Sequence, residues 1–230
     1  MAIKKPVSQG SRYKQKIDPV MFFIAYEGAK DEAEYFNALA EIFSTRVPKR
    51  LHNLFQFIPV DKTTTNGANS WVYLDLVQSL KSHGISQINR AHHVTFIVID
   101  CDHYFTGTHL TSSMQTLQLC KQKNINVICS NPSFEVWRLC HYLDLSTCSD
   151  DFLNKALINK KFFLKKEVSK KLGGESYLDQ IKRTKIALQN EDKLKQRLNC
   201  IKTPPTKLQS NIGLIFKQIE LKGMPITDYL

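Results

Sequence analysis

The chain has 230 residues, 42% of them hydrophobic and 23% charged, and it carries a formal net charge of +11. This length allows one large domain, or two compact units at most, with a sizeable core. No apolar run approaches the roughly 18 residues that span a bilayer, and the start has no signal-peptide pattern. We therefore expect a soluble, cytoplasmic protein with no membrane partner.

The positive charge is concentrated at the two ends of the sequence. Residues 1–18 hold five Lys and Arg against one acid, residues 151–230 hold 17 against 8, and the middle is close to −2. This distribution of charge is typical of a protein that binds a polyanion with basic residues at its periphery and acts on it with carboxylates. A solvated, lysine-rich surface that only aids solubility is the alternative interpretation.

The first 18 residues are polar and basic and show neither helical nor alternating periodicity, so they predict a flexible arm. From residue 19, short apolar runs alternate with helical stretches. Strands are expected at 20–26, 54–60, 93–99 and 125–129, and helices at 30–44, 71–83, 109–122 and 133–144. The strand runs are apolar at consecutive positions, as in parallel strands covered on both faces. Residues 19–150 thus predict an α/β domain with a mostly parallel sheet flanked by helices.

The amino-acid composition changes after residue 150. Residues 151–230 are lysine-rich and helical, with a break at Gly173 and Gly174 and a final helix expected at 206–221, after two prolines. These features predict a basic helical extension packed on the α/β domain. The six cysteines show no CxxC spacing and several lie in apolar segments, which favours reduced, buried thiols over disulfides or a zinc site.

Two of the predicted strands end in acidic residues. Glu27 follows the first strand, and Asp100 and Asp102 follow the third. Side chains at the carboxyl ends of parallel strands meet in one crevice, and alternation along an extended segment would put both aspartates on the same side, about 6 to 7 Å apart. Three carboxylates gathered there would repel one another unless Mg²⁺ or Mn²⁺ lay among them. A single acid at a strand end is more often a helix cap or a turn residue.

Two further acids lie beside this set. Gly28 permits a tight turn after Glu27, and Glu32 lies at the start of the next helix, either as another metal ligand or only as a charge that the helix dipole stabilises. Glu135 falls in the first turn of the helix that follows the fourth strand. It is either a further metal ligand and catalytic group or a capping-box acid that answers Ser130 or Asn131.

The segments EGAKDEAEYF, VIDCDHYF and SNPSFEVWRLCHYL resemble the RloB-like proteins, a bacterial family with a Toprim-type catalytic domain found in phage-defence loci. The segments SYLDQIKRTKIALQNEDKL and PPTKLQSNIGLIF resemble its C-terminal half more loosely. The likeness covers most of residues 20–220. It implies a Toprim, Rossmann-like fold in which Glu27 is the Toprim glutamate and Asp100 and Asp102 form the DxD pair that binds Mg²⁺ for phosphodiester chemistry.

The resemblance also implies a function. The resemblance to Toprim nucleases of the overcoming-lysogenization (OLD) type and of the PARIS system implies the effector nuclease of an abortive-infection module, with DNA or RNA, including tRNA, as the candidate substrates. Such effectors pair with an ATPase of the ABC or AAA kind, which this chain does not supply because it contains no GxxxxGK[ST] motif. A homodimer is plausible by the same analogy.

Four lysines of the extension are candidates for nucleic-acid binding: Lys165, Lys166, Lys170 and Lys171. The sequence does not choose among them. A non-catalytic Toprim-like module that docks on an ATPase or on nucleic acid stays open as a second hypothesis. Strand passage and primer synthesis are disfavoured, because so short a chain shows no additional domain for either reaction.

Overall fold

The computed structural model describes residues 18–63, 69–105, 109–200 and 203–230 of the chain. Residues 1–17 of the predicted arm lie outside the described residues. The strands are β1 (Val20–Tyr26), β2 (Phe55–Val60), β3 (His93–Asp100), β4 (Asn126–Asn131) and β5 (Gln209–Ser210). The helices are α1 (Asp31–Arg46), α2 (Lys49–His52), α3 (Asn69–Ser82), α4 (Cys101–Tyr104), α5 (Leu110–Lys123), α6 (Glu135–Cys140), α7 (Asp150–Ile158), α8 (Phe163–Leu172), α9 (Tyr177–Ile181), α10 (Thr184–Leu198) and α11 (Gly213–Leu221).

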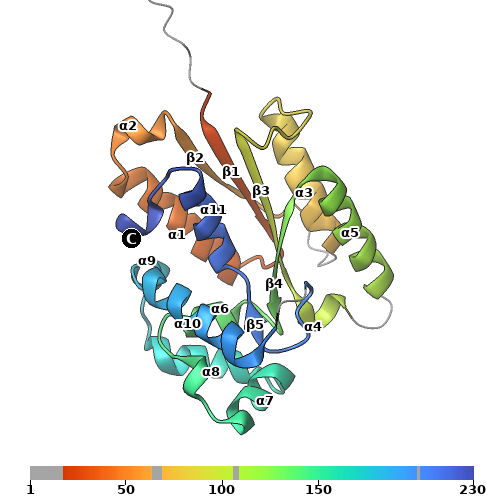
Figure 1. Ribbon diagram of the computed structural model, residues 1–230, viewed down its shortest axis with the longest axis vertical. Helices are drawn as coiled ribbons and strands as arrows, with labels where there is room; N and C mark the ends of the chain where they lie inside the picture. The colour runs from red at the N-terminus through yellow and green to blue at the C-terminus, as the bar shows by residue number, and fades with distance from the viewer. Residues whose placement is uncertain (1–17, 64–68, 106–108, 201–202) are drawn as a thin grey trace, which may run out of the picture.

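The five strands form one sheet in the order β2-β1-β3-β4-β5 (Figure 1). The first four are parallel to their neighbours, and only β5 is antiparallel. The prediction of a mostly parallel α/β sheet flanked by helices is therefore confirmed. Because Tyr26 pairs with Val98 and Asp100 pairs with Ser130, β1, β3 and β4 end at the same edge of the sheet.

Both faces of the sheet are buried, which explains the continuous apolar runs. Side chains of β1 alternate between two hydrophobic clusters. Phe22 and Ile24 pack with residues of α1 and α11, whereas Phe23 and Ala25 pack with residues of α3 and α5. Figure 1 shows the sheet between these two helical layers.

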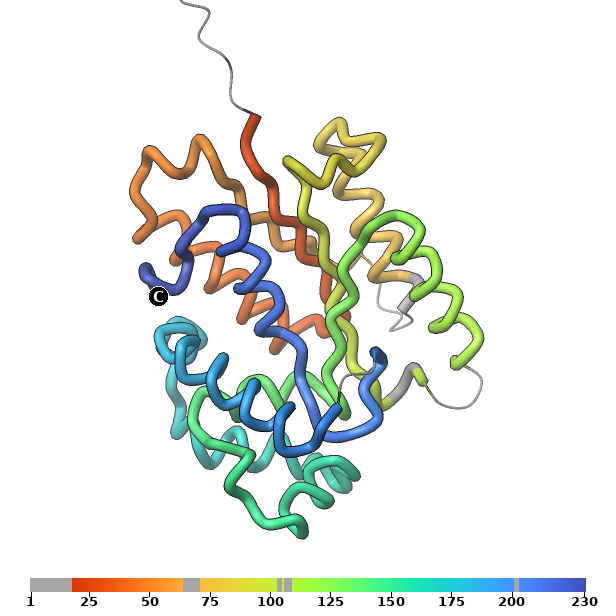
Figure 2. Tube along the Cα trace, viewed as in Figure 1, coloured from red at the N-terminus to blue at the C-terminus, as the bar shows by residue number. Residues whose placement is uncertain are grey.

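Helices α6 to α10 gather beyond the carboxyl ends of the strands, at the bottom of Figures 1 and 2. The apolar cluster that contains Phe22 continues into this region through Trp137, Leu164 and Leu194. Trp137 also stacks on Phe216 of α11, with ring centroids 5.9 Å apart. The C-terminal helices thus lie beside the edge where the predicted acids are expected. The domain boundary at residue 150 stays a prediction.

Two predicted helix boundaries are wrong. The final helix begins at Gly213 and not at residue 206, because Gln209 and Ser210 instead pair with the edge strand β4. The helix expected at 133–144 shortens to α6, which ends at Cys140. The amide of Asn190 donates a 2.8 Å hydrogen bond to the Cys140 carbonyl, so α10 satisfies an acceptor that another turn of helix would have used.

The prediction of free thiols is confirmed. All six cysteines are unpaired, and five of them are buried. No helix in the described part of the chain is long and apolar enough to cross a membrane.

Candidate functional site

Glu27 and Asp100 meet at the carboxyl edge of the sheet. Glu27 is the first residue after β1, and Asp100 is the last residue of β3, the neighbouring strand. The backbone N–H of Asp100 donates a 3.2 Å hydrogen bond to Oε2 of Glu27. Lys62, which follows β2, donates a 2.9 Å hydrogen bond to the Glu27 carbonyl. The parallel register therefore brings these two predicted acids together.

The Asp100 carboxyl group lies in an unfavourable environment for a charge. Its Oδ1 atom is buried and has no hydrogen-bond partner among the described groups. Burial raises the pKa of Asp100 well above its usual range, and the charges of Glu32, Glu27, Glu135 and Asp102 raise it further. The other four predicted acids thus all act electrostatically on the Asp100 carboxyl group.

Glu32 enters the cluster from the first turn of α1, and its side chain packs over Gly28. A Cβ atom at residue 28 would overlap the Glu32 carboxylate. Gly28 does not have a positive φ, so the turn after Glu27 does not by itself require glycine, and the requirement at this position is space for Glu32. Burial raises the pKa of Glu32 to about 7, and the charges of Glu135 and Asp31 contribute to the rise. Glu32 is therefore a buried member of the cluster and more than a helix-dipole charge.

Asp102 does not lie on an extended segment. The chain turns into helix α4 at Cys101, so the alternation expected to align Asp100 with Asp102 does not apply. The turn is held by the Pro132 carbonyl, which accepts 3.0 Å hydrogen bonds from the backbone N–H groups of Cys101 and Asp102. Asp102 is exposed, and among the four acids whose charges raise the pKa of Asp100 it has the smallest effect. It lies at the rim of the cluster, whereas Asp100 lies inside it.

Glu135 is buried in the first turn of α6, as the sequence predicted, but neither Ser130 nor Asn131 makes a capping box with it. The hydroxyl of Ser130 donates to Ser210, and the Asn131 amide donates to the Pro205 carbonyl. The partner of Glu135 is Ser133, whose hydroxyl donates a 2.5 Å hydrogen bond to Oε2. The cap hypothesis is wrong in this form, and the carboxylate is held toward the acidic cluster.

Lys165 forms long ion pairs with two carboxylates of this region. Its Nζ atom lies 3.6 Å from Glu135 Oε1 and 3.9 Å from Asp31 Oδ2, and its side chain is 59% exposed. The sequence offered four lysines without choosing among them. Lys166, Lys170 and Lys171 are exposed on α8 and form no ion pair with a described carboxylate, and contact of any of the four with nucleic acid stays a prediction.

Sequence reasoning missed the residues that hold α1 against the C-terminal helices. The Arg138 guanidinium and the Tyr177 hydroxyl each donate a 2.6 Å hydrogen bond to Oδ1 of Asp31. Arg138 also lies over the Tyr177 ring, 4.8 Å from its centroid. Arg138 is 8% exposed, and a buried arginine needs a carboxylate partner. That partner could not be identified from sequence because it is 107 residues away.

The arrangement provides carboxylate oxygens as hard donors, the Glu32 carboxyl group with a pKa of about 7, and the exposed cation of Lys165. Oxygen donors of this kind suit Mg²⁺ or Mn²⁺. Within the ranges that the structure describes, no three His, Cys, Asp or Glu side chains form a group that could hold a metal ion. The predicted metal site therefore stays a prediction.

Comparison with known families gives one match. The model of a family described as RloB-like protein matches residues 22–219. The match includes every predicted site residue, from Glu27 to Lys171. No curated protein and no solved structure matches the chain.

Proposed function

Because the chain belongs to the RloB-like protein family, we propose that it is a divalent-metal-dependent nuclease of the Toprim class. In this proposal it is the effector subunit of a phage-defence system and acts with an ABC- or AAA-type ATPase. The observation that carries the nuclease assignment is the buried Oδ1 atom of Asp100, which has no hydrogen-bond partner and is surrounded by acids. The ATPase partner and the defence role rest on the family resemblance alone.

The oxygen chemistry of the donor set suits the metal that the proposal requires, although among the described residues no three His, Cys, Asp or Glu side chains are arranged as a group that could hold a metal ion. Glu27, Asp100 and Asp102 would hold Mg²⁺ or Mn²⁺, with Glu32 beside them, because these are oxygen ligands and the Asp100 oxygen needs a positive partner. A bound divalent cation would supply activation of the attacking water and stabilisation of charge on the phosphodiester oxygens.

The chain's own residues account for the other requirements of the reaction. Glu27 is fixed by its hydrogen bond from the Asp100 amide, so it can accept a proton from a water molecule on the cluster side. Glu135 is held by Ser133 and lies beside Glu32, which can store a proton near neutral pH. The long ion pairs of Lys165 and its exposure leave its ammonium group free to turn toward a substrate phosphate. Lys166, Lys170 and Lys171 extend the positive surface along α8.

The test is cleavage of DNA and RNA panels, including tRNA, with Mg²⁺ or Mn²⁺ and with a co-purified ATPase partner. Glu27→Gln should lower the cleavage rate about 10²- to 10⁴-fold, as expected when a general base is lost. Asp151→Asn is the matched control, because Asp151 is exposed on α7 and pairs only with Lys155. Sequencing of nucleic-acid ends in cells that express each variant gives an independent readout. Equal cleavage by wild type and Glu27→Gln would contradict the proposed role of Glu27, and no cleavage in any of these settings would leave the non-catalytic module as the better account.

A further inference from the structure

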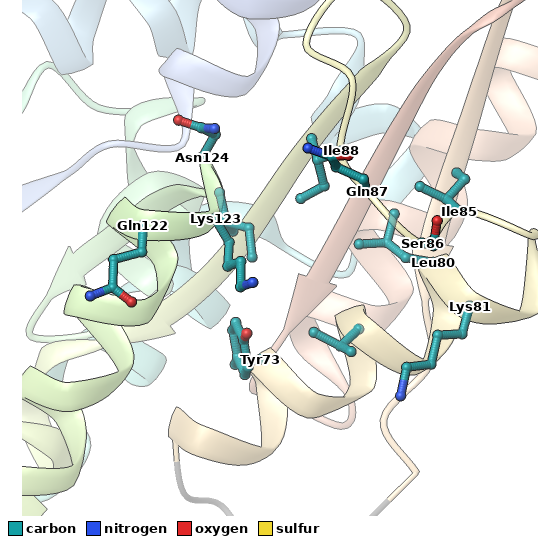
Figure 3. Close-up of a pocket in the computed structure, with 12 residues that line it drawn as sticks. Tyr73, Leu80, Lys81, Ile85, Ser86, Gln87, Ile88, Gln122, Lys123 and Asn124 are labelled. Atoms are coloured by element: carbon teal, nitrogen blue, oxygen red, sulfur yellow. The ribbon is translucent and has the colours of Figure 1, made fainter.

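A second concave site lies on the face of the sheet that carries α3 and α5. Its cavity volume is about 520 Å³, and it lies between the C-terminal halves of these helices and the loop that leads into β3. Figure 3 shows its lining residues. The proposed nuclease site is at the other end of the strands. Because β3 has eight residues that rise about 3.3 Å each, the two sites are roughly 20 Å apart.

The floor of this α3–α5 groove is apolar. Val77, Leu80, Ile85, Ile88 and Ile125 line it. Each of the two helices also carries an exposed leucine outside the lining itself. Leu74 lies one turn before Val77 on α3 and is 48% exposed, and Leu119 lies one turn before Lys123 on α5 and is 39% exposed.

Exposed apolar side chains near an apolar cavity are typical of a surface that a protein partner covers. A single exposed leucine is ordinary, but here one lies on each of the two helices that form the groove. The apolar floor and these two leucines therefore favour a protein partner for this surface.

The rim of the groove is positively charged. Lys81 on one wall and Lys123 on the other carry its charges, and no acidic residue lines it. A neighbouring cavity of about 420 Å³ shares Asn124 and Ile125 with the groove, and its cations are Arg90, Lys121 and Lys222, again with no acid.

None of these five cations forms an ion pair with a described carboxylate. On the C-terminal helices, Lys166, Lys170 and Lys171 of α8 are likewise without one, but eight cations are each paired with an acid: Lys155, Lys182, Arg183, Lys185, Lys193, Lys195, Arg197 and Lys217. Cations left without counter-charges around an apolar groove favour an occupant that carries negative charge.

We propose that the α3–α5 groove docks an acidic amphipathic helix of a partner protein. The apolar face of such a helix would lie on Val77, Leu80 and Ile88, and its acids would meet Lys81 and Lys123. The chain's own first 17 residues carry the wrong charge for this groove, since they contain five Lys and Arg and no acid. Nucleic acid fits less well because the aliphatic floor offers only Tyr73 for base stacking.

The test begins with a random-peptide library displayed on phage and selected against the full-length protein. Clones that also bind the Lys81→Glu/Lys123→Glu variant are removed. Both lysines are exposed, so this variant should fold. The enriched peptides are expected to be acidic, with leucine, isoleucine or phenylalanine at i, i+3 or i+4, and i+7 spacing.

One enriched peptide, labelled with fluorescein, then serves as the probe in polarisation measurements. Its Kd should rise about tenfold or more for Lys81→Glu/Lys123→Glu and severalfold for Leu119→Gln. It should change less than about twofold for Lys49→Glu/Lys160→Glu, which makes the same charge change at exposed lysines elsewhere.

Three results would overturn the proposal. The first is the enrichment of basic or uncharged peptides, or of none that depend on the groove. The second is competition by a single-stranded oligonucleotide for the probe together with oligonucleotide binding that is lost in Lys81→Glu/Lys123→Glu, which would assign the groove to nucleic acid. The third is a wild-type dimer in sedimentation that Leu119→Gln abolishes, which would assign it to a second copy of the chain.

Discussion

The carboxyl edge of the sheet and the α3–α5 groove both carry unbalanced charge, of opposite sign. At the carboxyl edge the carboxyl groups of Asp100, Glu32 and Glu135 are buried or partly buried, and Glu135 is held by the Ser133 hydroxyl. At the groove, Lys81 and Lys123 are exposed at the ends of long side chains. Repulsion among the buried carboxyl groups costs free energy because little solvent screens it. Repulsion between the exposed lysines is weak because water and salt screen it.

The difference indicates what each region is suited to do. Buried like charges change protonation states, as the raised pKa values of Asp100 and Glu32 show, and such changes serve chemistry. Exposed like charges leave protonation unchanged but attract a partner of opposite charge. The comparison therefore supports the proposals of catalysis at the carboxyl edge and of recognition at the groove, and variants at each region should separate the two.

The largest effect is expected from neutralising the centre of the acidic cluster. Asp100→Asn should lower metal-dependent cleavage about 100-fold or more, because it removes the oxygen that most needs a cation. In metal-free buffer the same variant should raise the free energy of unfolding, because the ionisable group that burial and the neighbouring acids disfavour is gone. Urea unfolding with EDTA measures the second effect. A variant that loses activity and stability together would indicate a structural aspartate.

The pH dependence of stability separates two buried groups near this edge. His141 is fully buried and its pKa is lowered to about 4, mainly by burial. Below about pH 6.5, His141 is protonated in the unfolded chain but stays neutral in the folded protein. Its effect should therefore lower the free energy of unfolding by about 2 kcal/mol between pH 7.5 and pH 5.

Glu32 should act with the opposite sign. Its raised pKa of about 7 means that the folded state binds the extra proton, so its contribution to stability grows as pH falls from about 8 toward 4.5. Urea titrations at several pH values, with EDTA, should show a shallower acid loss in His141→Gln and a steeper one in Glu32→Gln. Parallel profiles for wild type and both variants would contradict these assignments.

A smaller effect is expected from Gly28→Ala. The added methyl group would displace the Glu32 carboxylate, and cleavage should fall about tenfold because a site group has moved by about an ångström. Ala29→Ser, at the exposed neighbouring position, is the control. The loss should largely disappear when both variants are compared in a Glu32→Gln background. A full additional tenfold loss there would show that Gly28 acts through another residue.

The smallest effect is expected from the exposed lysines. Replacing Lys166, Lys170 and Lys171 by Gln should weaken binding of double-stranded nucleic acid and lower the slope of log K against log salt by at most about 2.7. Lys81→Gln/Lys123→Gln should leave that slope unchanged, because the groove is proposed to bind protein. Filter binding across a salt series measures both. An equal reduction of the slope in both variants would contradict the proposed difference between the lysines of α8 and those of the groove.

The sheet could be predicted from sequence because its signal is local. Strand β1 has the predicted bounds, since seven consecutive apolar residues end at an acid and a glycine. Strand β5 could not be predicted, because it consists of two polar residues whose only reason to be extended is the edge of β4. Helix α4 was missed because the carbonyl that holds its first turn belongs to Pro132, which is distant in sequence.

The candidate site follows the same division. The meeting of Glu27 and Asp100 follows from adjacent parallel strands and could be expected. Other features depend on contacts between distant segments. These are the turn that places Asp102, which the Pro132 carbonyl holds, and the ion pair between Lys165 and Glu135. No periodicity in the sequence encodes such contacts.

Calorimetric titration of the metal-free protein with Mn²⁺ tests the metal assignment at the carboxyl edge most directly, because it requires no knowledge of substrate or partner. Wild type and Asp151→Asn should bind the ion with the same affinity, and Asp100→Asn should lose the binding. Binding that is absent from wild type, or equally strong in Asp100→Asn, would contradict the assignment of these carboxylates to a metal-dependent nuclease.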